Sequence, residues 1–294
     1  MDNFCILCPR RCAAPRGAET PGGFCRSPLL PSVARAAAHY GEEPCIAGKN
    51  GTGAVFFTGC NLRCVFCQNR AISRGEGGKT LSVKELRALL LRLRDTGVDS
   101  IDLVTGAHYV PAIAEALSGL TLGIPVVWNS SGYENVEALR MLEGMVQVYM
   151  PDYKYSDPIA AKKYSAAADY PETARAAILE MYRQTGPAVL DENGLLRRGV
   201  LIRHLILPGQ LEDARDAVDF AADSFPPGSV LFSLMSQYTP MPGLGAFPEL
   251  QRRVSPEENE TLIHYMRVRG LSGFWQESAA ATEEEIPAFD LTGL

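Results

Sequence analysis

All eight cysteines of this 294-residue chain lie within its first 67 residues, and the rest of the chain contains none. The N-terminal sequence has no apolar stretch of the signal-peptide type, and no run approaches the roughly 18 apolar residues of a membrane helix. We therefore expect a cytoplasmic protein whose thiols stay reduced. Clustered thiols in a reducing compartment favour metal ligation over a disulfide framework.

Three of the thiols, Cys60, Cys64 and Cys67, fall within eight residues and directly follow an apolar stretch at 54–57. Structural zinc sites and most iron–sulfur clusters take four protein ligands, so three thiolates leave one iron of a cubic 4Fe–4S cluster open to a substrate or cosubstrate. The three-then-two spacing lets the loop wrap one face of the cluster, and Phe66 can cover it from solvent. The alternative is a four-ligand zinc or ferredoxin-type site that borrows a more distant cysteine.

A second group, Cys5, Cys8, Cys12 and Cys25, supplies the four thiolates that close a site. That number suits structural zinc or a fully ligated second 4Fe–4S cluster, and loose reduced thiols are the remaining alternative. The surrounding segment is rich in proline and glycine and has little periodicity, so bound metal is the natural means of ordering it. Cys45 either replaces Cys25 or is a buried apolar residue, and we favour the second reading.

Beyond this segment, short apolar stretches alternate with helical patterns. A capping box at Ser82 and Glu85 begins a leucine-rich helix, and Ser255 begins the last helix, which ends near Gly270. Apolar strands separated by helices indicate parallel βαβ units buried on both faces, and the carboxyl ends of such strands host chemistry. A turn at 191–194 indicates a hairpin before the fifth strand. The six expected strands are 54–57, 100–104, 124–128, 146–150, 200–207 and 230–234, and the helical patterns between or after them are 83–95, 110–118, 134–143, 158–166, 171–184 and 210–223.

Six such units fit an incomplete α/β barrel, a partial (β/α)6 barrel, better than a closed eight-unit barrel. We expect three parts: a Cys-rich N-terminal metal-binding segment over 1–52, the partial barrel over 53–277 and a C-terminal tail over 278–294. Hydrophobic residues make up 46% of the chain and charged residues 21%, as in ordinary globular proteins. The net charge of −6 provides no general basic field, so nucleic acid is not a favoured partner and we expect no membrane association.

The C-x3-C-x2-C spacing, with an aromatic residue before the last cysteine, resembles the signature of the radical S-adenosylmethionine (SAM) enzymes. The resemblance extends from about residue 5 to 277 and is closest in kind to the subgroup related to pyruvate formate-lyase activating enzyme. The segments that carry it are 42–46, 51–69, 103–109, 129–133, 151–155, 203–209 and 236–240.

The resemblance implies an oxidoreductase that cleaves SAM reductively at a 4Fe–4S cluster on Cys60, Cys64 and Cys67, giving methionine and a 5′-deoxyadenosyl radical that abstracts hydrogen. It also implies a reductant such as flavodoxin or ferredoxin and, in its narrower form, a glycyl radical enzyme to be activated. Radical modification of a peptide, a small molecule or RNA is the alternative, because pyruvate formate-lyase activating enzyme itself lacks the N-terminal cysteine module. A non-catalytic iron–sulfur or zinc protein is an alternative of another class.

Family members bind SAM with residues at successive strand ends, and the resemblance carries these roles to matching positions. Thr105 and Gly106 replace a Gly-Gly-Glu-like motif that meets the methionine amino group, and the acid is missing here. Arg203 matches a residue that faces the carboxylate of SAM. The remaining matches are Asn129 and Ser130 to an Asp-Thr-Asn-Gly pattern, Asp152 and Lys154 to an Asp-Leu-Lys pattern, and Gln237 to an adenosine-binding position.

The counterpart of Asp152 helps to hold a monovalent cation, which the change of an acid to Asn129 makes less expected. From the residues alone, a solvated ion pair between Asp152 and Lys154 is the alternative. Arg203 lies in an apolar strand where unpaired burial is costly, so an anionic partner is favoured. Packing is the default interpretation for the histidines and tyrosines near these motifs: His108, His204, Tyr133, Tyr153, Tyr155 and Tyr238.

Overall fold

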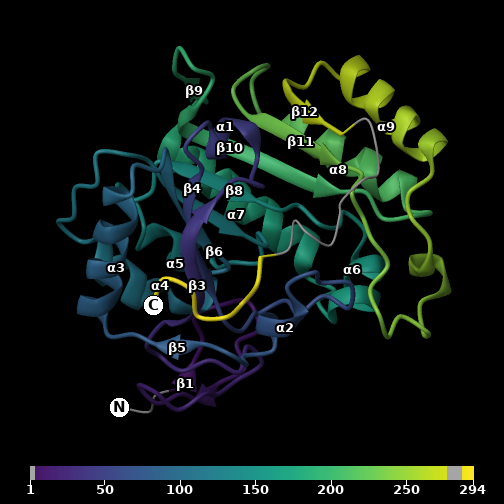
Figure 1. Ribbon diagram of the computed structural model, residues 1–294. Coiled ribbons are helices and arrows are strands. Elements are labelled where there is room, and N and C mark those ends of the chain that lie inside the picture. Colours follow the sequence, from purple (N-terminus) through teal and green to yellow (C-terminus); the bar gives the residue numbers. More distant parts are fainter. Residues whose placement is uncertain (1–3, 277–286) are drawn as a thin grey trace.

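Seven parallel strands form a curved wall through the centre of the molecule, which the computed structural model describes for residues 4–276 and 287–294 (Figure 1). Their order in the sheet is their order in the chain, as repeated βαβ units require. The six expected strands are confirmed within a few residues, and a short seventh follows the last helix. The strands are β4 (Thr52–Phe57), β6 (Ser100–Val104), β7 (Val126–Ser130), β8 (Val148–Pro151), β10 (Leu196–Leu205), β11 (Leu231–Met235) and β12 (Gly273–Trp275).

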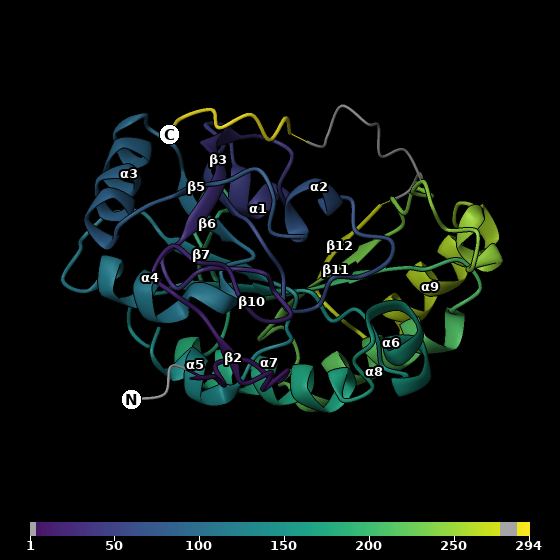
Figure 2. The same ribbon diagram turned by 90° about the horizontal axis from the view of Figure 1, so that it is seen from below.

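Helices cover the outer face of this wall, and α5, α7 and α8 follow one another along it in the view of Figure 2. The capping boxes at Ser82 and Ser255 are both present, each with a glutamate three residues later. The fold is thus the expected partial α/β barrel. The helices are α3 (Val83–Asp95), α4 (Val110–Leu117), α5 (Val136–Arg140), α6 (Pro158–Ser165), α7 (Tyr170–Thr185), α8 (Leu211–Ser224) and α9 (Pro256–Val268).

The sheet begins earlier in the chain than we expected. Strand β3 (Ser32–His39) pairs antiparallel with β4 and with β5 (Lys79–Thr80), so residues assigned to the N-terminal segment belong to the main sheet. Residues near the end of the chain add to this edge: the Leu291 amide donates to the Ala34 carbonyl at 3.0 Å, and the Ala36 amide donates to the Thr292 carbonyl at 2.9 Å. The boundary expected at residue 52 therefore does not separate the N-terminal segment from the barrel sheet, because Ser32–His39 belongs to that sheet.

The N-terminal residues form a small two-stranded sheet of their own, β1 (Phe4–Cys5) with β2 (Ala14–Pro15), which lies below the barrel in Figure 1. Strand β9 (Val189–Leu190) pairs antiparallel with β10, which confirms the hairpin at 191–194. No helix among the described residues is long and apolar enough to span a membrane. The remaining short helices are α1 (Pro44–Ala47), α2 (Arg70–Ser73), η1 (Ala107–Tyr109) and η2 (Pro248–Gln251).

Helix α1 packs into the inner face of the barrel. Its residues Cys45 and Ile46 are buried against inward-facing side chains such as Val127 and Val148. Cys45 is therefore a buried apolar residue, as we favoured. Because α1 fills one end of the inner space with apolar side chains, the polar residues of the inner face gather toward the carboxyl ends of the strands.

Candidate active site

The loop with three cysteines leaves the carboxyl end of β4. Gly59 has a φ of +80°, and a Cβ there would lie 2.0 Å from Ser27 Oγ, so only glycine lets the loop pass this close to the N-terminal segment. The amides of Leu62 and Arg63 approach Cys60 Sγ at 3.3 and 3.5 Å. The backbone therefore already points donors at a sulfur that carries negative charge when it binds iron.

Cys60 is buried, and Cys64 and Cys67 are half-buried. Burial, followed by the charges of Cys64 and Cys60, raises the pKa of Cys67 to about 12, and burial raises the pKa of Cys60, while Lys154 opposes both shifts. All three are free thiols. Three thiols from one loop are one fewer than the ligands that a structural zinc site or most iron–sulfur clusters take from the protein.

Phe66 lies between the last two cysteines of the loop and is buried in a group of tyrosines. Its ring makes edge contacts with Tyr155, Tyr164 and Tyr238 at centroid distances of 6.1–6.3 Å. This aromatic layer closes the side of the loop that faces α6, and excludes water from it.

Arg203 is the centre of a buried polar network on the inner face of the barrel. Its Nε donates to Asp152 at 2.9 Å, Nη1 to Glu42 at 2.8 Å and Nη2 to Asn129 Oδ1 at 2.6 Å. The structure thus brings together the side chains from three strand ends that the sequence predicted, and gives Arg203 the anionic partner that we favoured. Because all three nitrogens of Arg203 are engaged by protein oxygens, we infer that the arginine orders the network around it.

Asp152 bridges Arg203 to Lys154, whose Nζ lies 2.5 Å from the other carboxylate oxygen. Burial acts to raise the pKa of Asp152, but Arg203 and Lys154 outweigh it and lower that pKa. Burial likewise acts against the charge of Lys154, and Asp152 reverses this and raises the pKa of the lysine. The pair is half-buried and linked to Arg203, so it is not the free solvated ion pair of the alternative. Lys154 connects the network to the cysteine loop, since its charge acts on both Cys60 and Cys67.

Three acids of this network were missed from the sequence. Glu42 and Glu43 come from the turn before α1, where Glu43 accepts a hydrogen bond from Ser233 at 2.7 Å. Asp102 lies inside β6, and burial followed by the nearby Glu42 raises its pKa well above the ordinary value. Its Oδ1 is buried without a hydrogen-bond partner among the described residues. An acid within an apolar strand signals a polar site, because it cannot be buried unpaired at low cost.

Asn129 and Ser130 point to opposite faces of β7. The Asn129 amide donates to Glu42 at 3.0 Å and to Asp102 at 3.2 Å, so it belongs to the network. Ser130 Oγ instead donates to Glu134 at 2.6 Å, on the side where Trp128 also donates to that carboxylate. Burial raises the pKa of Glu134 to about 7. The Ser130 hydroxyl therefore serves the local structure.

Thr105 and Gly106 follow β6 at the same end of the sheet. Thr105 has a φ of +63°, which is unusual for a β-branched residue and marks local strain, while its amide donates to the Asn129 carbonyl at 2.8 Å. Gln237, after β11, pairs with the side chain of Gln276, which the sequence did not predict. The Thr105–Gly106 segment and Gln237 both lie at strand ends, as expected, but on opposite sides of the network around Arg203.

The two histidines near the site are neutral packing residues. Burial lowers the pKa of His108 to about 3 and that of His204 to about 4, and each ring nitrogen that bonds does so to a backbone carbonyl, of Thr58 and Tyr153 respectively. The expected packing role is confirmed.

The other cysteine group, Cys5, Cys8, Cys12 and Cys25, lies in and beside the β1–β2 hairpin. Cys8 and Cys25 are buried, and Cys12 is exposed. Arg10 of this segment donates to the carbonyls of Asn61 and Leu62, so the segment is in contact with the cysteine loop of the barrel.

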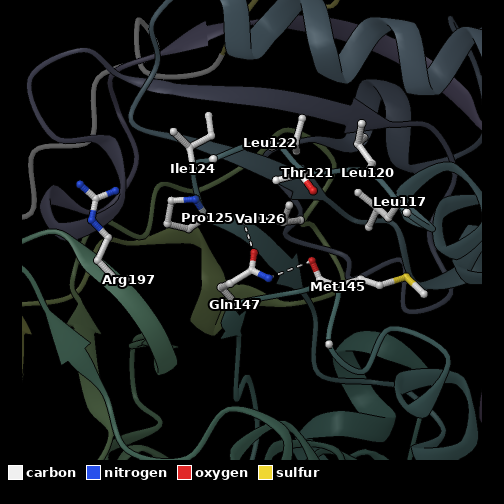
Figure 3. Close-up of a pocket in the computed structure, with 13 residues that line it drawn as sticks. Leu117, Leu120, Thr121, Leu122, Ile124, Pro125, Val126, Met145, Gln147 and Arg197 are labelled. Atoms are coloured by element: carbon white, nitrogen blue, oxygen red, sulfur yellow. Dashed lines mark hydrogen bonds between the residues drawn. The ribbon is translucent and has the colours of Figure 1, made fainter.

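A cavity of about 590 Å³ lies at the opposite, amino end of the strands (Figure 3). It is formed by the loops before β7 and β8, and Gln147 spans it with hydrogen bonds to Val126 and Met145. Its lining includes Arg197 but none of the network or cysteine residues, so it is separate from the candidate site.

Comparisons with known proteins agree with this geometry. The model of the radical SAM superfamily matches residues 54–221. An uncharacterized protein of Methanocaldococcus jannaschii is 30% identical over 270 residues, covering 88% of this chain and 73% of that protein. The anaerobic ribonucleoside-triphosphate reductase-activating protein of Enterobacteria phage T4 is 27% identical over 131 residues, 41% of this chain and 83% of that protein.

Among solved structures, Streptococcus suis SuiB bound to the precursor peptide SuiA superposes with a TM-score of 0.50 at 13% identity. The superposition covers 74% of this chain but only 46% of SuiB, so the present chain spans less than half of that protein. This likeness concerns the fold.

Proposed function

The chain belongs to the radical SAM superfamily, and we propose that it cleaves SAM at a 4Fe–4S cluster bound by Cys60, Cys64 and Cys67. Once reduced by one electron from an external reductant, a cluster held by these three thiolates would supply the electron needed to cleave SAM into methionine and a 5′-deoxyadenosyl radical. One observation carries the proposal: three free thiols from a single loop lie within reach of the charge of Lys154, which begins the half-buried chain of charges Lys154, Asp152 and Arg203.

The residues around the loop have separate tasks. Lys154, whose charge acts on Cys60 and Cys67, offers its ammonium group to the carboxylate of SAM. Glu42 and Asp102 supply the carboxylate oxygens that the Thr105–Gly106 segment lacks, and so accept from the amino group of SAM. Arg203 is a positioning residue that orders Asp152, Glu42 and Asn129. A monovalent cation beside Asp152 stays a prediction.

We further propose that the substrate is a glycyl radical enzyme that this protein activates. Support comes from the phage T4 relative, which is named as an activating protein for anaerobic ribonucleoside-triphosphate reductase. Peptide modification is the second candidate, because SuiB, which shares the fold, was solved with a precursor peptide.

Anaerobic reconstitution with iron and sulfide, followed by dithionite and SAM, tests the chemistry. We expect 5′-deoxyadenosine from the intact chain and from Cys45→Ala, whose thiol lies in the apolar inner core. We expect none from Cys64→Ala at equal folding by circular dichroism. A verified cluster in the intact chain without any 5′-deoxyadenosine would contradict the proposal.

The substrate class is tested with proteins that copurify with the chain under anaerobic conditions. A glycyl-radical EPR doublet that depends on SAM and on Cys64 supports activation. A SAM-dependent mass change in a peptide, without that doublet, favours the second candidate.

A further inference from the structure

The two cysteine groups of this chain contain loops of the same local form. Cys8 and Cys12 are separated by three residues, as are Cys60 and Cys64, and in each loop the residue before the second cysteine is an arginine. Arg11 has a φ of 39° and Arg63 a φ of 56°, so both adopt the left-handed conformation that side chains other than glycine rarely take. Two independent loops therefore accept the same backbone strain at the same position.

The first sulfur of each loop also meets the same backbone donor. Cys60 Sγ is approached by the amide of Leu62, two residues later, at 3.3 Å. The backbone of Arg10, two residues after Cys8, likewise lies within hydrogen-bonding reach of the Cys8 sulfur. Donors aimed at a sulfur favour its thiolate, which is the form that binds metal.

Two further thiols complete the N-terminal group. The hairpin register places Cys5 opposite Ala14, and a tight turn closed by the pairing of Gly22 with Ser27 presents Cys25. A Cβ on Gly23 would lie 3.0 Å from Cys12 Sγ, so this turn passes directly beside the third thiol.

The four thiols lie within electrostatic reach of one another. Cys8 lies close enough to Cys25, Cys5 and Cys12 for the charge of each to act on its sulfur. Arg16 Nη1 lies 3.4 Å from Cys5 Sγ and provides a positive charge to the group. All four are free thiols, without a disulfide between them.

We propose that Cys5, Cys8, Cys12 and Cys25 bind a second iron–sulfur cluster, of the 4Fe–4S type with all four irons held by protein. The ground for a cluster of the same kind is the loop form that the two cysteine groups share, with a left-handed arginine directly before the second cysteine of each loop. This inference rests on the proposed cluster at Cys60, Cys64 and Cys67. The metal content of variants that lack one cysteine group distinguishes the N-terminal cluster from the cluster of the barrel loop.

The second cluster would also hold the first cluster's loop in place. Arg10, between Cys8 and Cys12, donates to the carbonyl of Asn61 at 2.8 Å and to that of Ser165 at 2.7 Å. The ring of Phe24, next to Cys25, lies 4.0 Å from the Arg10 guanidinium and 5.1 Å from that of Arg63. Binding metal at the N-terminal cysteines fixes these contacts on the loop that carries Cys60 and Cys64.

The test is the metal content of variants reconstituted anaerobically. In Cys60→Ala/Cys64→Ala/Cys67→Ala we expect about four iron and four sulfide per chain, with Mössbauer parameters of a 4Fe–4S cluster with four thiolates. This variant has no cluster for SAM, so its iron content is independent of the proposed catalysis. About one zinc per chain in this variant, or a chain free of bound metal, would overturn the proposal.

A second variant guards against misfolding of the first. In Cys8→Ser/Cys12→Ser we expect iron to fall from about eight to about four per chain, and in the control Cys45→Ala we expect it to stay near eight. Iron near eight in the serine variant would refute the assignment of these thiols.

Discussion

The two ends of the parallel sheet differ in kind, although the same strands build both. At the carboxyl ends, four polar side chains from four elements form a network around Arg203, next to three thiols and a strained Thr105. At the amino ends, loops of ordinary polarity surround an open cavity in which Gln147 makes the bridging contacts. Backbone strain and charged contacts are therefore concentrated at the carboxyl ends. Substitutions of the same chemistry should change the free energy of unfolding more at that end than at the amino end.

The largest difference in unfolding free energy between the two ends is expected for two arginines of β10. Arg203→Met leaves Glu42 and Asp152 buried without their cation and should cost about 3–5 kcal/mol of unfolding free energy, with loss of SAM cleavage. Arg198→Met, at the exposed amino end of β10, should cost less than about 0.5 kcal/mol. Urea unfolding of both variants gives the comparison, and equal costs would remove the distinction between the ends.

The next effect concerns pH. The pKa of Glu134 is raised by burial from 4.5 to about 7, so the folded state keeps a proton that the unfolded state releases. Stability from this group is full below about pH 4.5 and is lost as the pH rises to 7, by about 3 kcal/mol.

Glu134→Gln should lack this part of the pH dependence, whereas Glu143→Gln, in the exposed loop before β8, should retain it. Unfolding free energies measured between pH 4.5 and 7.5 provide the check. A parallel decline for Glu134→Gln and the intact chain would show that Glu134 is ionised in the folded state.

A smaller effect is expected for two glycines with similar backbone angles. Gly132, at the carboxyl end of β7, has a φ of +71°, and a Cβ there would lie 2.7 Å from the Asp152 carbonyl oxygen. Gly123, in the cavity, has a φ of +76° and open space around it. Alanine should cost about 1 kcal/mol at Gly123 and about 1–3 kcal/mol more at Gly132. Thermal unfolding of the pair measures the difference, which vanishes if the strand ends are free to move apart.

The smallest effect is expected within the cavity. Thr121→Ala removes an exposed hydroxyl and should change the unfolding free energy by less than about 0.5 kcal/mol and leave 5′-deoxyadenosine formation unchanged. A substantial loss of turnover in this variant would show that the amino end contributes to the reaction.

The sequence predicted the parallel strands because each is apolar on both faces, a pattern that few other structures produce. It did not predict β3, whose run Ser32–His39 contains four alanines and an arginine and has Val33 as its single β-branched residue. Pairing with β4, rather than local preference, makes this segment a strand.

At the site, Asp152, Lys154 and Arg203 were predicted from the resemblance to radical SAM enzymes, which bind SAM at successive strand ends, and parallel strands bring those ends to a common edge. Glu42 was missed because it comes from a turn before α1, and no periodicity connects that turn to the strand ends. The pairing of Gln237 with Gln276 was missed for the same reason, since β12 is only three residues long.

The Tyr170 hydroxyl couples helix α7 to the carboxyl end of the sheet. Its hydroxyl lies 2.8 Å from the carbonyl oxygens of both Ser131 and Asp152, and accepts the amide of Lys154 at 2.7 Å. One phenolic oxygen thus fastens the tips of β7 and β8 to each other and to the first turn of α7. Any displacement of that helix, by a docking partner or by crowding from outside, must carry Asp152 and Lys154 with it.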